Sequence, residues 1–149
     1  MDYADFQFLQ FEHRPNGVLV MTLNRPEVMN ATNARLHWEL TKIWAVIHDD
    51  PKTKCVVVTG AGDKAFSAGG DLDWVAGMVG NPKAVGVVMQ EAADLVYNMM
   101  ACDKVIIAAI NGPAAGLGMV IPLYADLRFA GESAVFTTAF AQRGLIAEH

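Results

Sequence analysis

The N-terminal part of the chain shows the alternation of hydrophobic and polar positions that is typical of strands. Residues 6–12 alternate apolar and polar side chains, residues 13–17 have the composition of a turn, and residues 18–23 alternate less strictly. Two short runs on either side of a turn predict a β-hairpin.

Two later segments repeat their apolar residues at the spacing of an amphipathic helix. The first covers residues 32–48, with Asn30 or Thr32 available as the N-cap. Its apolar face carries Leu36, Leu40, Ile43, Trp44 and Ile47. The second covers residues 84–101, with Val85, Val88, Met89, Ala92, Leu95, Val96 and Met99 on one face.

Two short runs, residues 55–59 and 105–110, are apolar almost throughout and predict buried strands. Such strands alternate with the predicted helices, which indicates an α/β domain with a largely parallel sheet covered by helices. The chain has no internal repeat, low-complexity tract or linker.

The composition favours a single soluble domain. Of the 149 residues 53% are hydrophobic, but the longest strictly apolar run, residues 105–110, is far shorter than the ~20 residues of a membrane span. We therefore assign the apolar surplus to a core and an interface, with no membrane as partner. Residues 1–5 lack the basic start and apolar stretch of a signal peptide, so a cytoplasmic location is expected.

Charge and titratable residues exclude some classes of site. Lys and Arg total 11 against 16 Asp and Glu, giving a net charge of −5 without any basic cluster, which argues against nucleic acid as a partner. Cys55 and Cys102 are expected to be small buried hydrophobes without a disulfide. His13, His37 and His48 lack partners at metal spacing, so solvated or capping roles and no metal site are expected.

Two loops rich in small residues follow the two apolar strands: Gly60-Ala61-Gly62-Asp63-Lys64-Ala65-Phe66-Ser67-Ala68-Gly69-Gly70-Asp71 and Asn111-Gly112-Pro113-Ala114-Ala115-Gly116-Leu117-Gly118. One glycine alone is typical of a tight turn. A pair of such loops can aim backbone N–H groups from separate parts of the chain at one developing oxyanion. The first loop also fits G-x-G-x-x-A, but it continues as loop where a nucleotide-binding fold needs a helix, so that class is rejected.

With their flanking residues, these loops resemble the crotonase superfamily, the enoyl-CoA hydratase/isomerase family. The resemblance also rests on Leu23-Asn24-Arg25-Pro26 with Asn30-Ala31, on Ile107-Ala108-Ala109-Ile110, and on Ala125-Asp126 with Ala130. It implies a crotonase-like ββα superhelix of repeated strand-strand-helix units, with residues 1–149 as an incomplete acyl-CoA-binding core. Because residues 144–149 lack a turn, cap or polar tail, we expect an N-terminal portion of a longer protein whose C-terminal helical region is missing. The full-length protein would form a homotrimer or a dimer of trimers.

The resemblance further implies an acyl-CoA thioester as substrate, with coenzyme A as part of that substrate and no separate cofactor. The two backbone donors to the thioester oxygen would be Gly70 and Leu117, the latter at the start of a predicted helical segment, residues 116–123. The substrate-binding residues that it implies for coenzyme A and the acyl group are Arg25, Glu27, Val28, Met29, Ala68, Asp71, Leu72, Trp74, Val120 and Phe140.

The chain departs from the two-glutamate hydratases of this family, because Val120 and Phe140 occupy the positions of their two catalytic glutamates. Glu148 falls where relatives with other chemistries carry a catalytic carboxylate, and it is the candidate base. We therefore expect an enoyl-CoA hydratase/isomerase-like lyase or isomerase of fatty acid metabolism. The alternatives are a non-catalytic acyl-CoA-binding member and a CoA thioester hydrolase, while dehalogenation is disfavoured because it uses the shorter Asp as nucleophile.

Overall fold

The computed structural model describes residues 1–138 and 140, and its centre is a five-stranded sheet with the order β1-β2-β3-β4-β6. The strands are β1 (Leu9–Arg14), β2 (Val18–Leu23), β3 (Cys55–Gly60), β4 (Val105–Ile110) and β6 (Leu127–Ala130). β1 pairs antiparallel with β2, and the pairs β2–β3, β3–β4 and β4–β6 are parallel. The prediction of a largely parallel sheet is confirmed.

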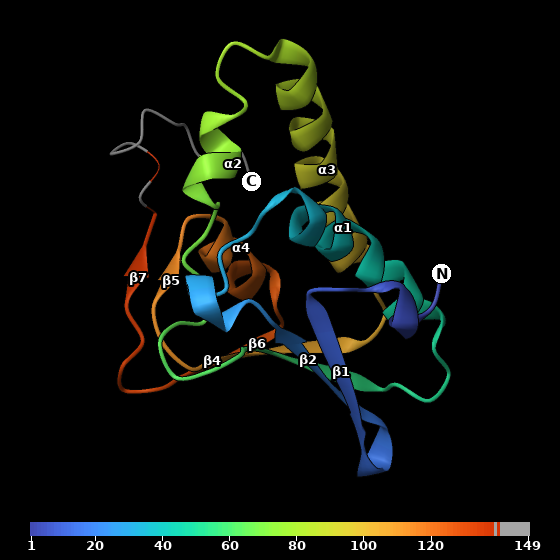
Figure 1. The fold of residues 1–149 in the computed structure, drawn as a ribbon. Coiled ribbons are helices and arrows are strands. Elements are labelled where there is room, and N and C mark those ends of the chain that lie inside the picture. Colours follow the sequence, from blue (N-terminus) through green and yellow to red (C-terminus); the bar gives the residue numbers. More distant parts are fainter. Residues whose placement is uncertain (139, 141–149) are drawn as a thin grey trace.

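Four helices lie on the same side of this sheet (Figure 1). They are α1 (Ala34–Asp49), α2 (Leu72–Ala76), α3 (Pro82–Ala101) and α4 (Leu117–Tyr124). Alternate residues of β2, β3 and β4 are buried, as expected for strands that turn one row of side chains toward a helical layer. The core cluster includes Leu19, Met21, Val56, Val58, Ile106 and Ala108 from the strands and Leu36, Leu40, Ile43, Trp44, Ile47 and Leu95 from the helices.

The hairpin differs from its predicted bounds. β1 begins at Leu9 instead of residue 6 and continues to Arg14, so that only the short 3₁₀ turn η2 (Pro15–Gly17) separates it from β2. The reason is tertiary: the N–H groups of Gln7 and Phe8 donate to the buried Glu39 carboxylate of α1, at 2.6 and 2.9 Å. Both N–H groups are thereby held against the helix, and only the Phe8 carbonyl continues the pairing with the neighbouring strand, through the Asn24 N–H at 2.8 Å.

The cap of α1 was also predicted wrongly. Its N-cap is Asn33, whose Oδ1 accepts a hydrogen bond from the Leu36 N–H at 2.9 Å. Asn30 and Thr32 instead contact the first glycine loop, as described below. The second predicted helix corresponds to α3 and begins two residues earlier than predicted. Asn81 caps it through the Ala84 N–H, and Pro82 follows at its first position.

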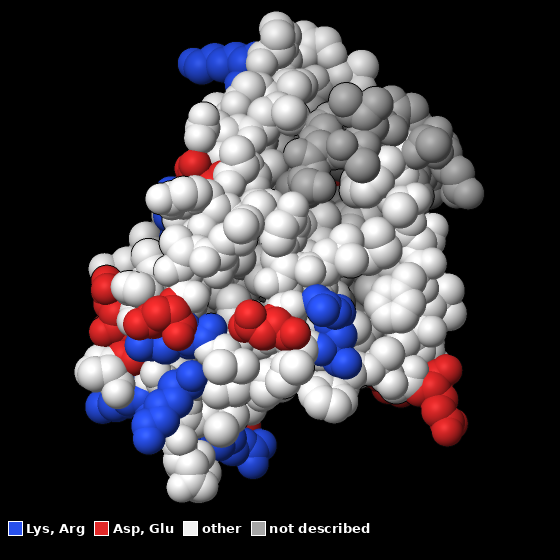
Figure 2. Space-filling view, turned by 180° about the vertical axis from the view of Figure 1, so that it is seen from behind, with Lys and Arg blue, Asp and Glu red and all other residues white. Residues whose placement is uncertain are grey.

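Large apolar side chains remain exposed on α3 and β6. Val87, Tyr97 and Met100 of α3 are 53%, 72% and 71% exposed, and Leu127 and Phe129 of β6 are 49% and 64% exposed. In Figure 2 most charged side chains gather over the lower half of the molecule, and the upper part, which α3 occupies, carries few. None of the helices in the described part of the chain has both the length and the apolar character needed to cross a membrane.

Candidate functional site

The two glycine loops lie side by side at one edge of the sheet. They follow β3 and β4, which are neighbouring parallel strands, so both loops begin at the same edge of the sheet. Main-chain hydrogen bonds then join the loops: the Ser67 N–H donates to the Pro113 carbonyl at 3.2 Å, and the Ala115 N–H donates to the Ser67 carbonyl at 3.0 Å. The loops therefore continue the sheet as a parallel bridge between Ser67 and Ala114. Beyond it, β5 (Ala114–Ala115) pairs with β7 (Phe136–Thr137).

Two glycines allow the loops to approach this closely. Gly69 has a φ of +86°, and a Cβ at this position would lie 2.5 Å from the Ala115 carbonyl oxygen and 3.5 Å from the Leu117 nitrogen. A Cβ at Gly118 would lie 2.5 Å from the Ser67 carbonyl oxygen. Because they lack a Cβ, these glycines let the backbones of the two loops come into close contact.

The N–H groups of Gly70 and Leu117 stand where the loops meet. The neighbours of Gly70 pair with Thr32 through the Gly69 carbonyl at 2.7 Å and the Asp71 N–H at 2.9 Å, so the Gly70 N–H points to the other side of this extended segment. Leu117 is the first residue of α4, where a backbone N–H has no acceptor within its own helix. Within residues 1–138 and 140, neither N–H donates a hydrogen bond.

Asn30 and Ser67 hold the first loop in place, and sequence reasoning missed both. The Asn30 side chain accepts from the Arg25 N–H at 3.0 Å and donates to the carbonyls of Ala61 and Ala65 at 2.9 and 3.0 Å. Ser67 Oγ donates to the Asn30 carbonyl at 2.9 Å. Asn30 has a φ of +54°, a conformation that Asn adopts more readily than most residues. That preference was the available signal, but the two carbonyls that the side chain binds lie more than 30 residues away.

The Arg25 side chain is turned into the protein. It is 12% exposed, forms a 3.3 Å ion pair with Asp71, donates to the Ala31 carbonyl and lies over the Phe8 ring. The turn that follows it, η3 (Pro26–Val28), is more open: Val28 and Met29 are 37% and 50% exposed. A hollow of about 260 Å³ between this turn and the first loop is lined by Pro26, Glu27, Met29, Ala61, Gly62, Asp63 and Lys64.

The remaining predicted site residues of the described chain lie on the first loop, on α2 and α4, and beside the N-cap of α4. Val120 is buried on α4, and the Phe140 ring comes within 3.7 Å of where a Cβ on Gly116, the N-cap of α4, would stand. Leu72 and Trp74 belong to α2, and Ala68 donates its N–H to the Met29 carbonyl at 2.9 Å. Glu148 and its neighbour His149 lie outside the described residues.

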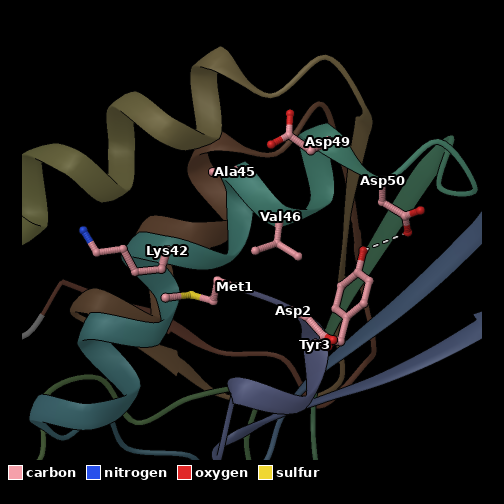
Figure 3. Close-up of a pocket in the computed structure, with 8 residues that line it drawn as sticks. All are labelled: Met1, Asp2, Tyr3, Lys42, Ala45, Val46, Asp49 and Asp50. Carbon is pink, nitrogen blue, oxygen red and sulfur yellow. Dashed lines mark hydrogen bonds between the residues drawn. The ribbon is translucent and has the colours of Figure 1, made fainter.

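Another hollow lies away from the glycine loops. It measures about 510 Å³ and lies between the N-terminus and α1, without any residue of the glycine loops (Figure 3). There the Tyr3 hydroxyl donates to Asp50 at 3.0 Å. Partial burial and this hydrogen bond raise the pKa of Tyr3 to about 12. The hollow is lined by Met1, Asp2, Tyr3, Lys42, Ala45, Val46, Asp49 and Asp50.

The expectation for His37 was wrong. Its side chain is only 1% exposed, and its Nδ1 lies 2.7 Å from the Glu91 carboxylate of α3. Helical spacing placed it beside the apolar face, but only the packing of α3 brought a carboxylate to it. Both cysteines are free and partly buried, and burial raises the pKa of each thiol. The described residues contain no cluster of three or more His, Cys, Asp and Glu side chains suited to a metal ion.

Comparison with known proteins decides the family. The model of the enoyl-CoA hydratase/isomerase family matches residues 13–149. The chain belongs to the enoyl-CoA hydratase/isomerase family. It is 36% identical over 136 residues to a 1,2-epoxyphenylacetyl-CoA isomerase of Escherichia coli, covering 90% of this chain and 52% of that protein. It is 39% identical over 136 residues to a probable enoyl-CoA hydratase of Rhodobacter capsulatus, covering 87% and 49%.

The fold of this enoyl-CoA hydratase/isomerase family member is also found among solved structures. An enoyl-CoA hydratase/isomerase from Mycobacterium paratuberculosis superimposes with a TM-score of 0.90 at 32% identity, covering 96% of this chain and 57% of that one. The predicted family and the crotonase-like fold are thereby confirmed. The chain spans about half the length of the curated relatives that it matches.

Proposed function

We propose that the protein containing this chain is an acyl-CoA lyase or isomerase that stabilises a thioester enolate with the N–H groups of Gly70 and Leu117. The observation that carries the proposal is the pairing of the two glycine loops, which leaves these two N–H groups without an acceptor among the described residues. Family membership supplies the substrate class, because the named relatives include a CoA-thioester isomerase and a probable enoyl-CoA hydratase.

The two donors would act on the charge that develops during reaction. Removing a proton beside a thioester, or adding a nucleophile to its conjugated double bond, moves negative charge onto the carbonyl oxygen. Preorganised N–H donors stabilise that charge without having to reorient, and removal of one such donor typically costs about 10²–10³ in rate. The α4 dipole would add to this effect, because Leu117 is at its positive end.

Proton transfer falls to a single carboxylate in this proposal. Val120 and Phe140 cannot exchange protons, so Glu148 would take the proton from C2 of a 3-enoyl thioester and return it to C4, which moves the double bond. For hydration, the same carboxylate would deprotonate water as its oxygen bonds to C3 and then protonate C2. Coenzyme A enters only as part of the substrate, and a cytoplasmic homotrimer or dimer of trimers remains our expectation.

A non-catalytic acyl-CoA-binding protein is the second candidate, and the replacement of both family glutamates by Val120 and Phe140 favours it. A CoA thioester hydrolase is the third. Turnover separates all three functions: a product with a moved double bond or added water supports the proposal, release of free CoA supports the hydrolase, and binding without any product supports the non-catalytic candidate.

The proposal is tested by titration calorimetry and turnover with the complete natural protein. We expect a long-chain acyl-CoA to bind more tightly than free CoA, since only the thioester offers the carbonyl oxygen. Leu117→Pro removes one donor at the first position of α4, where proline is tolerated, and should lower kcat about 10²–10³-fold. Leu117→Ala is the matched control, because it loses the buried side chain but keeps the N–H. Equal binding of thioester and free CoA, or equal loss of kcat in both variants, would contradict the proposal.

A further inference from the structure

The short helix α2 is weakly embedded, although it adjoins the first proposed donor. It has five residues, none of them buried, and a helix of this length is not stable without tertiary contacts. Asp71, the residue after Gly70, is its N-cap, and a Cβ on Gly70 would lie 3.1 Å from Val75 Cγ2. The position of α2 and the direction of the Gly70 N–H are therefore linked.

An ion pair and a ring contact join α2 to other parts of the described chain. At its start, Asp71 pairs with Arg25. In its middle, the Trp74 ring packs against the His37 ring of α1, with 5.2 Å between the ring centroids and 47° between the planes. Arg25 therefore holds the first end of the helix, and His37 contacts its middle.

His37 is itself held rigidly. Its Nδ1 lies 2.7 Å from the Glu91 carboxylate of α3, within hydrogen-bond distance. Thr41 Oγ1 bridges the same two helices, at 3.1 Å from the His37 carbonyl and 3.2 Å from the Glu91 carbonyl. A ring that is 1% exposed and bonded at one nitrogen cannot turn without losing that bond.

We propose that His37 is a positioning residue, which holds Trp74 and α2 and through them the N–H group of Gly70. Glu91 fixes the His37 ring and so belongs to the same arrangement. The role in turnover rests on the proposed function of Gly70, whereas the placement of Trp74 by His37 does not. Loss of the His37 ring should free α2, expose Trp74 and misdirect one of the two donors.

The test is a double-mutant cycle of His37→Ala and Trp74→Ala in the complete natural protein. Subtracting the fluorescence of each protein's Trp74→Ala counterpart isolates the Trp74 signal. We expect His37→Ala to increase acrylamide quenching of Trp74 about twofold and shift its emission to longer wavelength. Since a misplaced donor affects the transition state more than substrate binding, kcat should fall about tenfold with little change in KM. The double variant should be no slower than either single variant.

Conservative variants separate positioning from general stability. His37→Phe keeps a ring against Trp74 and should keep it shielded. Glu91→Leu frees the His37 ring and should raise Trp74 quenching, and it serves as the second probe if His37→Ala does not fold. Glu91→Gln restores an acceptor and should restore the shielding. Thr53→Val removes a hydrogen bond to Asp50 at the other end of α1, so it should lower thermal stability but leave quenching and kcat unchanged.

Unchanged Trp74 quenching in both His37→Ala and Glu91→Leu would overturn the proposal. Additive losses of kcat, or an equal loss in Thr53→Val, would overturn it as well. If the wild-type protein converts no thioester, the proposed function fails and the quenching measurements alone decide whether His37 positions Trp74.

Discussion

The side chain of Asn111 binds both backbone polar groups of Gly60. Its Oδ1 accepts from the Gly60 N–H at 3.1 Å, and its Nδ2 donates to the Gly60 carbonyl at 3.0 Å and to the Gly62 carbonyl at 2.9 Å. Gly60 is the last residue of β3, and Asn111 follows directly after β4. The amide thus replaces the backbone partner that the parallel ladder lacks at its end, and it joins the first residues of the two glycine loops.

Loss of this amide should destabilise the domain. Asn111→Ala removes these three hydrogen bonds and a fourth, longer one from Thr59 Oγ1 at 3.4 Å, and should lower the free energy of unfolding by about 1–3 kcal/mol, measured by urea denaturation. Asn111→Asp keeps the shape but directs an oxygen at two carbonyls, so it should destabilise at least as much. Asn98→Ala, which loses one bond to the Thr41 carbonyl, is the control with a smaller expected effect. Wild-type stability in Asn111→Asp would show that the pairing is unimportant.

Glycine substitutions should have opposite effects at two sites. Gly69→Ala forces a side chain into the left-handed region and against the Ala115 carbonyl, so it should destabilise the protein and part the two loops. Gly86 lies within α3 with open space around it, and Gly86→Ala should stabilise the protein by about 0.5–1 kcal/mol. Thermal unfolding of both variants checks this, and a tolerated Gly69→Ala would refute the close approach of the loops.

The role of Glu148 can be decided by kinetics alone. In the complete natural protein, Glu148→Gln keeps the shape of the side chain but cannot carry a proton. If Glu148 is the base, hydration of a 2-enoyl-CoA and isomerisation of a 3-enoyl-CoA should both fall about 10²–10⁴-fold. Glu132→Gln is a control on another carboxylate of the described chain, and it should change neither rate. A loss of less than about threefold in Glu148→Gln would exclude it as the catalyst of that reaction.

Stability should decline at high pH because of Tyr3. Its pKa of about 12 in the folded protein lies above the ordinary value of 10.0, since partial burial and the hydrogen bond to Asp50 favour the neutral phenol. The unfolded chain therefore loses this proton first, and the stabilisation present below pH 10.0 is lost as the pH rises to about 12. Tyr3→Phe should remove this part of the pH dependence in urea denaturation, whereas Tyr97→Phe, at an exposed residue, should preserve it.

The sequence by itself determined the elements whose signal is local or repeated. The apolar runs of β3 and β4 and the helical spacing of residues 36–47 appeared almost at their observed bounds, because burial of a face selects residues at a fixed period. The motifs around Gly70 and Leu117 were sufficient to identify the family, because their glycines mark positions where two backbones must approach each other. The same reasoning anticipated that each of these loops follows a buried strand, whereas the pairing of the two strands came from the structure.

Only the tertiary structure decided which polar side chains serve those loops. The Asn30 side chain binds the first glycine loop instead of capping a helix. The Glu39 carboxylate binds the Gln7 N–H, and His37 is buried against Glu91. Each of these contacts joins residues more than 30 positions apart. A polar side chain forms hydrogen bonds with the groups that folding brings close to it. For a buried side chain such a partner is required, since an unpaired polar group in the core is costly. Such partners depend on how α1, α3 and the sheet pack, and no local pattern in the sequence records that.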